Sequence, residues 1–297
     1  MLQKTKSKGY TSDTLKGLLL LLPAMGLLIT FFLTPMFFTV YYALTNLALT
    51  GAAAANLEFI GLDNFTRMVA DPRFVTSVWR TLVFVFFSAV MGQCLVGFTL
   101  AFLMKEKQVV FRRVVGLCIL AAWVTPEIVA AFALVVFFGD GGSANWIVTT
   151  LGFEPIAWLW EYPMVSVVVA NVWRGTAFSM MVFQAALDDI PKAVEEAAVM
   201  DGANPVTLLF RITVPMVKGT ITTNMMLVTL QTLGVFTLIF AMTGGGPGDR
   251  TMTLPIFIYQ QSFMVGQLGY GVAISLVLLS IGGLASLVYV KLLDIKV

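Results

Sequence analysis

Very few residues of this sequence could carry out covalent chemistry. The 297 residues include no histidine, and the two cysteines, Cys94 and Cys118, both lie inside apolar runs. The commonest general base and metal ligand is therefore missing, and neither a disulfide framework nor a cysteine zinc site is available. No Gly-Lys-Ser or Gly-Lys-Thr occurs, so the chain carries no P-loop for ATP. The sequence predicts no catalytic residues, no metal site and no cofactor in this chain.

Two charged residues stand out because each lies near the middle of a long apolar run: Glu127 and Arg174. A charge in lipid is costly, so each should face protein or a water-filled cavity. The two could face each other as a structural ion pair. Alternatively, Arg174 could line a pathway for a solute. The sequence leaves both possibilities open.

The composition indicates an integral membrane protein. Hydrophobic residues make up 59% and charged residues only 11%, whereas a soluble domain has about 25% charged residues. The net charge of +2 gives no bias towards polyanions. A membrane span needs about 20 apolar residues, and its backbone must satisfy its own hydrogen bonds, so each span is expected to be a helix. The sequence therefore predicts an all-α integral membrane protein with six spans, at 18–42, 81–104, 114–138, 164–187, 214–242 and 271–293.

The basic residues predict the orientation of these spans. Thirteen of the 18 Lys and Arg residues lie in 1–17, 105–113, 188–218 and 291–297. Because basic loops remain on the cytoplasmic side, both termini are expected there. The chain then consists of a cytoplasmic segment, 1–17, one transmembrane domain, 18–293, and a cytoplasmic tail, 294–297. The first apolar run exceeds the 7–15 residues of a signal peptide, which predicts a retained helix. Short outer helices are expected at 63–70 and 144–151.

The cytoplasmic loop at 188–215 differs from the rest of the chain. Pro191 suits the first position of a helix, and Gly202 suits its end. Asn204 is then a candidate N-cap for a second short helix that starts with a proline. The small side chains of Ala197 and Ala198 would let another surface approach closely. The loop is therefore expected to be a helix–Gly–helix that docks a soluble partner.

This loop resembles a motif of a known family, the permease subunits of binding-protein-dependent ABC importers. Their EAA motif is matched by Glu-Ala-Ala at 196–198, by Gly202 and Ile212 with nine residues between them, and by Pro215 after Val214, where leucine is usual. Two further matches are Thr-Gly-Gly-Gly-Pro at 243–247 and Phe-Ile-Gly-Leu-Asp-Asn-Phe at 59–65. Together they resemble the carbohydrate-uptake subfamily, which includes maltose, trehalose and glycerol phosphate permeases.

The resemblance implies a type I permease fold and an assembly. A second permease subunit, two copies of an ATPase that bind ATP and Mg, and an extracytoplasmic solute-binding protein would complete an importer in the bacterial inner membrane. The EAA loop would be the coupling helix that seats in the ATPase, which makes this chain a permease and not an enzyme. The residues implied in that contact are Glu196, Ala197, Ala198, Asp201, Gly202 and Pro215.

The same resemblance places the sugar pathway on the fourth and fifth spans. The matched positions are Asn171, Arg174, Gly175 and Phe178 in the fourth span, and Val228, Gln231, Thr232 and Val235 in the fifth. Fewer amides and the presence of Arg174 depart from the maltose permease, which argues against maltose itself. The presence of Arg174 leaves open that the solute is an anionic sugar, for which Arg174 would be the counter-charge. Another possibility left open is that the partner permease alone contacts the sugar.

Two other classes of function compete with this interpretation. A proton-coupled secondary transporter would use Glu127 as its carrier, but it would need no EAA loop and often shows inverted repeats. An intramembrane enzyme would need a catalytic base or a metal cluster, which the sequence does not offer.

Overall fold

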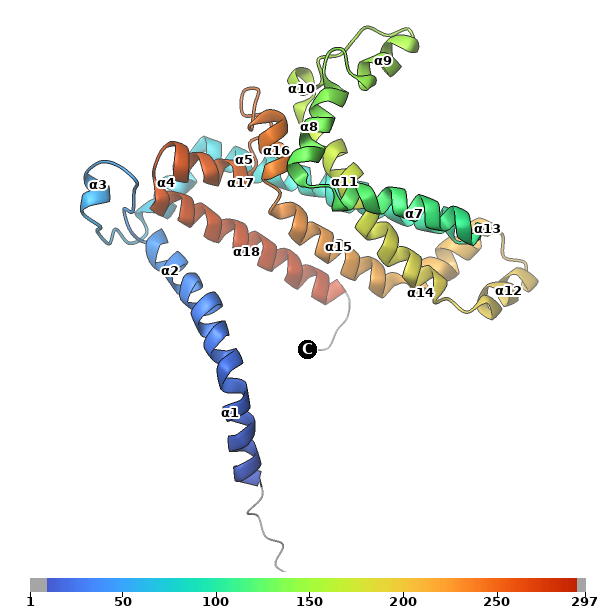
Figure 1. Ribbon diagram of the computed structural model, residues 1–297, viewed down its shortest axis with the longest axis horizontal. Coiled ribbons are helices and arrows are strands. Elements are labelled where there is room, and N and C mark those ends of the chain that lie inside the picture. The colour runs from blue at the N-terminus through green and yellow to red at the C-terminus, as the bar shows by residue number, and fades with distance from the viewer. Residues whose placement is uncertain (1–9, 293–297) are drawn as a thin grey trace, which may run out of the picture.

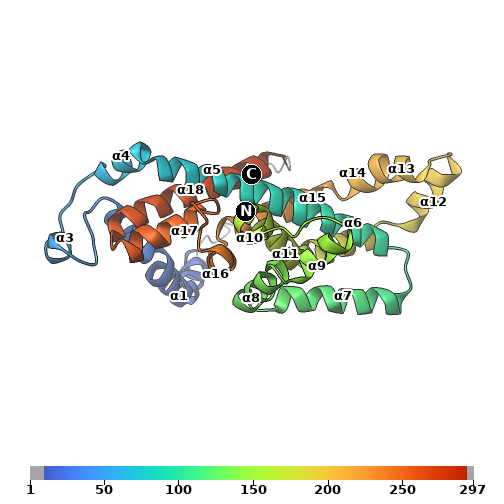
Figure 2. The same ribbon diagram turned by 90° about the horizontal axis from the view of Figure 1, so that it is seen from above.

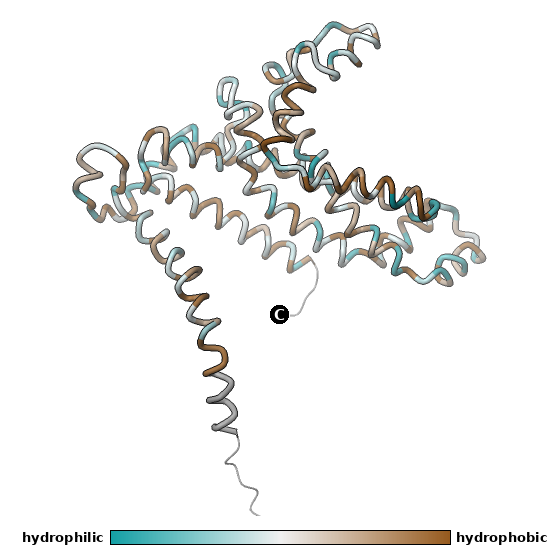
Figure 3. The backbone as a smooth tube through the Cα atoms, in the orientation of Figure 1, coloured by the Kyte–Doolittle hydropathy of each residue, from teal (hydrophilic) through white to brown (hydrophobic). Residues whose placement is uncertain are grey.

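The computed structural model describes residues 10–292, and these are helical apart from connecting loops and an isolated bridge between Thr45 and Phe59. Five helices are long and apolar enough to cross a membrane, and a bent pair makes a sixth candidate. Figure 1 shows most of the long helices running side by side in one elongated body, and Figure 3 shows apolar residues along them. The predicted all-α membrane architecture is confirmed.

The first two long spans contain π-helical turns. The first consists of α1 (Tyr10–Leu28), η1 (Ile29–Leu33) and α2 (Thr34–Ala43). After the short helices α3 (Ala52–Ala55) and α4 (Asp63–Ala70), the second consists of α5 (Pro72–Val85), η2 (Phe86–Cys94) and α6 (Leu95–Met104). It therefore begins nine residues earlier than the apolar run suggested.

The segment expected as one span at 114–138 is two helices, α7 (Val109–Val124) and α8 (Glu127–Phe138). The break lies at Thr125 and Pro126, whose ψ angles of 128° and 139° are not helical. Proline cannot donate a backbone hydrogen bond, and it disfavours helical geometry in the residue before it. Figure 1 shows α8 leaving the direction of α7 at this point.

The fourth span is one uninterrupted helix, and the fifth is bent. α9 (Ser143–Thr150) and α10 (Trp158–Glu161) precede α11 (Pro163–Asp188). The segment expected to be a helix–Gly–helix forms α12 (Lys192–Met200), α13 (Pro205–Leu208), η3 (Leu209–Thr213) and α14 (Val214–Met216). α15 (Lys218–Leu233) and α16 (Thr237–Thr243) then meet at an angle of 50°. α17 (Leu254–Tyr259), η4 (Gln260–Met264) and α18 (Leu268–Leu292) complete the chain.

Buried apolar side chains form two clusters. One includes residues of α8, α16, α17 and the start of α18, and the other includes residues of η2, α6, α11 and α15. Leu278 and Ile281 of α18 contact both clusters. The last helix therefore joins the two halves of the body.

The second and fourth spans cross at very close range. A Cβ atom at Gly92 would lie 2.1 Å from the Val172 side chain, and one at Gly97 would lie 2.6 Å from Ser179 Cβ. Real Cβ atoms do not make contacts this short. Glycine at these two positions lets the backbones approach, as is common between membrane helices.

The N-terminal part of the first span, α1, is separate from this body, whereas α2 packs against α18. Among the residues of the first span from Leu19 onward, Ala43 alone is buried, and Figure 1 shows α1 projecting away from the other helices. The exposed apolar residues between Leu19 and Phe38 need another surface, either lipid or protein, to cover them.

The close crossing predicts that Gly97→Ala destabilises the protein by about 1–3 kcal/mol, because the added methyl group meets the Met180 backbone nitrogen as well as Ser179. Gly116→Ala in α7 is the matched control, because no atom lies within 4 Å of the added methyl group. Thermal unfolding of the purified protein in detergent measures both effects. Equal unfolding temperatures for the two variants would contradict the close crossing.

Candidate functional site

The cytoplasmic loop expected at 188–215 forms a helical hairpin at one end of the body. Gly202 has a φ of +87° and ends α12, and the Ala203 N–H donates to the Ala198 carbonyl at 2.9 Å. The Asn204 side chain accepts a hydrogen bond from the Thr207 N–H at 2.8 Å, so the expected N-cap is confirmed. Figures 1 and 2 both show α12 at the opposite end of the body from α3.

The hairpin presents a shallow hollow between its two helices. Ala198 is buried, whereas Glu196 and Ala197 are exposed. Ala197, Ala198 and Asp201 therefore lie together, as expected, while Pro215 lies outside the hollow. Its wall includes residues that the motif did not single out, and the full lining is Ala193, Val194, Ala197, Ala198, Asp201, Ala203 and Ile212.

Two ion pairs attach this region to the neighbouring ends of α6, α7 and α11. Lys105, which follows α6, pairs with Glu195 of α12, and Arg112 of α7 pairs with Asp188 at the end of α11. Glu196, by contrast, forms no ion pair with any residue between 19 and 292. Of the two adjacent glutamates, one anchors α12 and the other is free to meet a partner. Sequence reasoning did not distinguish them, because no local pattern links Lys105 to Glu195.

The structure shows that the two charges inside the apolar runs pair with each other. Arg174 Nη1 lies 3.0 Å from Glu127 Oε1, and the side chains are 24% and 31% exposed, respectively. The Arg174 Nε atom is buried and has no hydrogen-bond partner. Next to this pair, Trp123 at the end of α7 and Phe178 of α11 stack at a centroid distance of 6.2 Å. Both pairs join the broken third span to α11.

The other expected pathway residues of the fourth span face the second span. The Asn171 amide donates to Ser88 Oγ at 3.0 Å, and the Asn171 carbonyl accepts from Gln93 Nε2 at 3.2 Å. A Cβ at Gly175 would lie 2.2 Å from the Gln93 side chain. In this structure Asn171 and Gly175 therefore serve helix packing, whereas Arg174 and Phe178 lie on the side of α7 and α8.

The expected pathway residues of the fifth span also differ in their exposure. Val228 and Thr232 of α15 are buried, and Gln231 is exposed. Val235 lies in the bend between α15 and α16 and is half-buried. The structure therefore does not bring all eight residues to one surface.

The glycine-rich segment that ends the fifth span is a fixed turn. Gly244 and Gly245 have positive φ angles, which favour glycine. Asp249 pairs with Arg73 of α5 at 3.0 Å, and Arg250 donates to the carbonyls of Trp160 and Glu161 at 3.3 and 3.4 Å. These contacts attach the turn to the second span and to the loop before α11.

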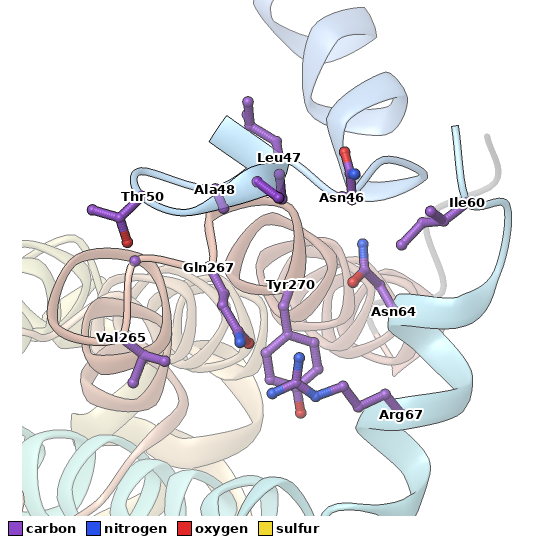
Figure 4. Close-up of a pocket in the computed structure, with 13 residues that line it drawn as sticks. Asn46, Leu47, Ala48, Thr50, Ile60, Asn64, Arg67, Val265, Gln267 and Tyr270 are labelled. Carbon is purple, nitrogen blue, oxygen red and sulfur yellow. The ribbon is translucent and has the colours of Figure 1, made fainter. Parts of the chain in front are cut away.

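Sequence reasoning missed a polar hollow near α3, with a volume of about 400 Å³. Figure 4 shows Arg67 of α4 beside Tyr270 of α18, and the guanidinium lies 4.4 Å from the ring centroid. Asn46 and Gln267 also line the hollow. It is distant in sequence from the EAA loop and belongs to the end of the body opposite α12.

The Lys105–Glu195 pair predicts different roles for the two glutamates of α12. Glu195→Ala is expected to weaken the attachment of α12 by roughly 1 kcal/mol, and so to raise amide exchange in α12 about fivefold. Glu196→Ala is the control and should leave exchange unchanged, since Glu196 has no ion-pair partner among the side chains described at 19–292. Hydrogen exchange with mass spectrometry measures both. If exchange in α12 is the same in the two variants, the anchoring role is wrong.

Comparison with known proteins agrees with this arrangement. Residues 93–297 match the family described as "Binding-protein-dependent transport system inner membrane component". The sulfoquinovosyl glycerol transport permease of Agrobacterium fabrum is 32% identical, with 96% of this chain and 92% of the relative covered. The trehalose/maltose transport permease of Thermococcus litoralis is 29% identical, with 93% and 92% covered.

A third relative and a solved structure are also similar to this chain. The sn-glycerol-3-phosphate transport permease of Pectobacterium atrosepticum is 30% identical, with 88% of each chain covered. A chain of a bacterial alginate ABC transporter, solved with an alginate-bound periplasmic protein, matches the fold with a TM-score of 0.80. Its identity is 19%, and 97% of this chain and 98% of that chain are covered. The predicted resemblance to carbohydrate-uptake permeases is confirmed, and the chain belongs to the family of binding-protein-dependent transport system inner membrane components.

Proposed function

We propose that this chain is one permease subunit of an ATP-driven importer that takes up a sugar or a sugar derivative. The observation that carries the proposal is the exposed α12–α13 hairpin, with Glu196 free, in a chain of this transporter family. The relatives above are named for sulfoquinovosyl glycerol, for trehalose and maltose, and for glycerol phosphate. These names support a sugar-like solute and leave its charge open.

In this proposal the hairpin transmits movement from a separate ATPase that binds and hydrolyses ATP with Mg. Glu196, Ala197, Ala198, Asp201 and Gly202 form or shape the contact, and Pro215 begins the return to the membrane. When the ATPase dimer closes, it moves α12. The Lys105–Glu195 pair passes that movement to the second span, and the helices rock as rigid bodies.

Two other partners would complete the assembly. A second permease subunit would cover α1, whose exposed apolar surface no other part of the described chain approaches. An extracytoplasmic binding protein would deliver the solute to the opposite end from α12, where the loops around α3 and α4 lie. The solute would then pass Arg174 and Phe178 on α11 and Gln231 on α15.

The proposed location is the bacterial inner membrane with both termini in the cytoplasm. The separation of the basic α12 end from the α3 end supports this orientation. A proton-coupled carrier that uses Glu127 has less support, because this carboxylate pairs with Arg174 and its protonation would break the pair.

Glu196→Lys is expected to reduce ATPase retention and uptake by at least about tenfold, because the reversed charge faces the partner surface. Glu106→Lys reverses another exposed charge at the cytoplasmic end and is the matched control. Co-purification of the ATPase and uptake by cells report the outcome. Normal retention together with normal uptake in Glu196→Lys would refute the coupling role.

The orientation is tested with single cysteines in a background that lacks Cys94 and Cys118. Cysteine at Glu154, which is exposed between α9 and α10, should react with an impermeant thiol reagent added outside intact cells. Cysteine at Met200, which is 87% exposed in α12, should react only after the membrane is opened. The reverse pattern of labelling would overturn the orientation.

A further inference from the structure

The break in the third span creates a composite surface with the fourth span. Trp123 lies in the last turn of α7 on one side of the break, and Glu127 begins α8 on the other. They contact Phe178 and Arg174 of α11, respectively. Residues 174 and 178 are one helical turn apart and share a face of α11. An aromatic pair and an ion pair therefore lie next to each other.

The contacts within this surface leave part of each side chain exposed. Trp123 is 37% exposed, and the Arg174 and Glu127 side chains are 24% and 31% exposed. One contact of 3.0 Å joins the two charged groups. The Arg174 Nε is buried, but the two terminal nitrogens carry four N–H donors, and a carboxylate has two acceptor oxygens. Donors and acceptors thus remain available beside exposed aromatic surface. That combination suits a polyhydroxylated ring, which offers hydroxyl groups at its edge and C–H groups on its face.

The ion pair also determines which charge this surface accepts. An isolated guanidinium would attract an anionic solute. Here Glu127 balances the charge of Arg174 at contact distance, and a carboxylate, phosphate or sulfonate placed against Arg174 would also approach the Glu127 carboxylate. Like charges brought together at a binding surface strongly disfavour the wrong partner. An uncharged sugar meets no such repulsion and can use the guanidinium as donor and the carboxylate as acceptor.

We propose that Trp123 and Glu127 complete, with Arg174 and Phe178, a contact site for an uncharged sugar, and that Glu127 makes the site reject anionic sugars. The proposal rests on the proposed function as a sugar permease and names the charge class of its solute. In this proposal the third span contributes to the selection of the solute. Arg174 acts as one member of an ion pair without net charge.

The test measures binding to the assembled, nucleotide-free transporter without its binding protein, by equilibrium dialysis at millimolar sugar. The probes are maltose, trehalose and cellobiose, each with the corresponding uronic acid. The wild type is expected to bind an uncharged sugar at least about tenfold more tightly than its acid. Glu127→Gln should abolish or reverse this preference, and Trp123→Ala should weaken binding of the uncharged sugar about tenfold. Glu154→Gln, in an exposed outer loop, is the matched control and should change nothing.

Removing one partner of the pair leaves a charge without compensation and can impair assembly. The exchanged variant, Glu127→Arg with Arg174→Glu, keeps the pair neutral, so it should assemble and retain the preference for the uncharged sugar. Tighter binding of the acids by the wild type overturns the proposal. An unchanged preference in Glu127→Gln, loss of preference in the exchanged variant, or no binding of any probe also overturns it.

Uptake by the complete importer in proteoliposomes separates this inference from the proposed function. ATP-dependent sugar uptake together with one of the overturning results means that the charge assignment alone is wrong. If the complete importer takes up no sugar of either class, the proposed function itself fails.

Discussion

Two opposite charges lie within the apolar part of this chain, and neither could remain there at low cost without the other. Arg174 lies on α11, a continuous helix, so its position is set by that helix. Glu127 reaches it because Pro126 interrupts the third span and lets α8 begin in a new direction. Glu127 then lies in the first turn of α8, where the helix dipole favours a negative charge. The ion pair and the broken helix therefore depend on each other.

The same break organises the opposite half of the bundle. α8 follows the break in the third span and α16 follows the bend in the fifth, and these two helices pack against each other. α11 runs unbroken for 26 residues past both. It ends at Asp188, which pairs with Arg112, so the helix that carries Arg174 also reaches the end of the body where α12 lies. Under the proposed coupling, a displacement at α12 acts on a stiff helix that leads directly to the ion pair.

The sequence was most informative where local chemistry decides structure. The helix at 63–70 matches α4, and that at 144–151 falls within one residue of α9, while Gly202 and Asn204 end and begin helices as their side chains suggest. It was least informative where distant segments meet. Spacing places residues 171, 174, 175 and 178 on one stripe, but it cannot show that Gln93 occupies one edge of the stripe and Glu127 the other. Pro126 was visible in the sequence, yet the apolar residues on both sides of it read as one continuous span.

Polar contacts also explain why α1 stands apart. Asn224 of α15 donates to Ser179 Oγ at 3.0 Å and to Cys94 Sγ at 3.3 Å, which links the fifth, fourth and second spans inside an apolar core. Thr229 and Tyr289 connect α15 to α18 in the same way, at 3.0 Å. In a membrane, apolar surfaces gain little by leaving lipid for one another, so close packing and directional bonds of this kind decide which helices form one body. The side chains described in α1, from Leu19 onward, make no such bond to another span, and only its continuation α2 packs against α18. The exposed surface of α1 therefore supports the proposed second subunit as its neighbour.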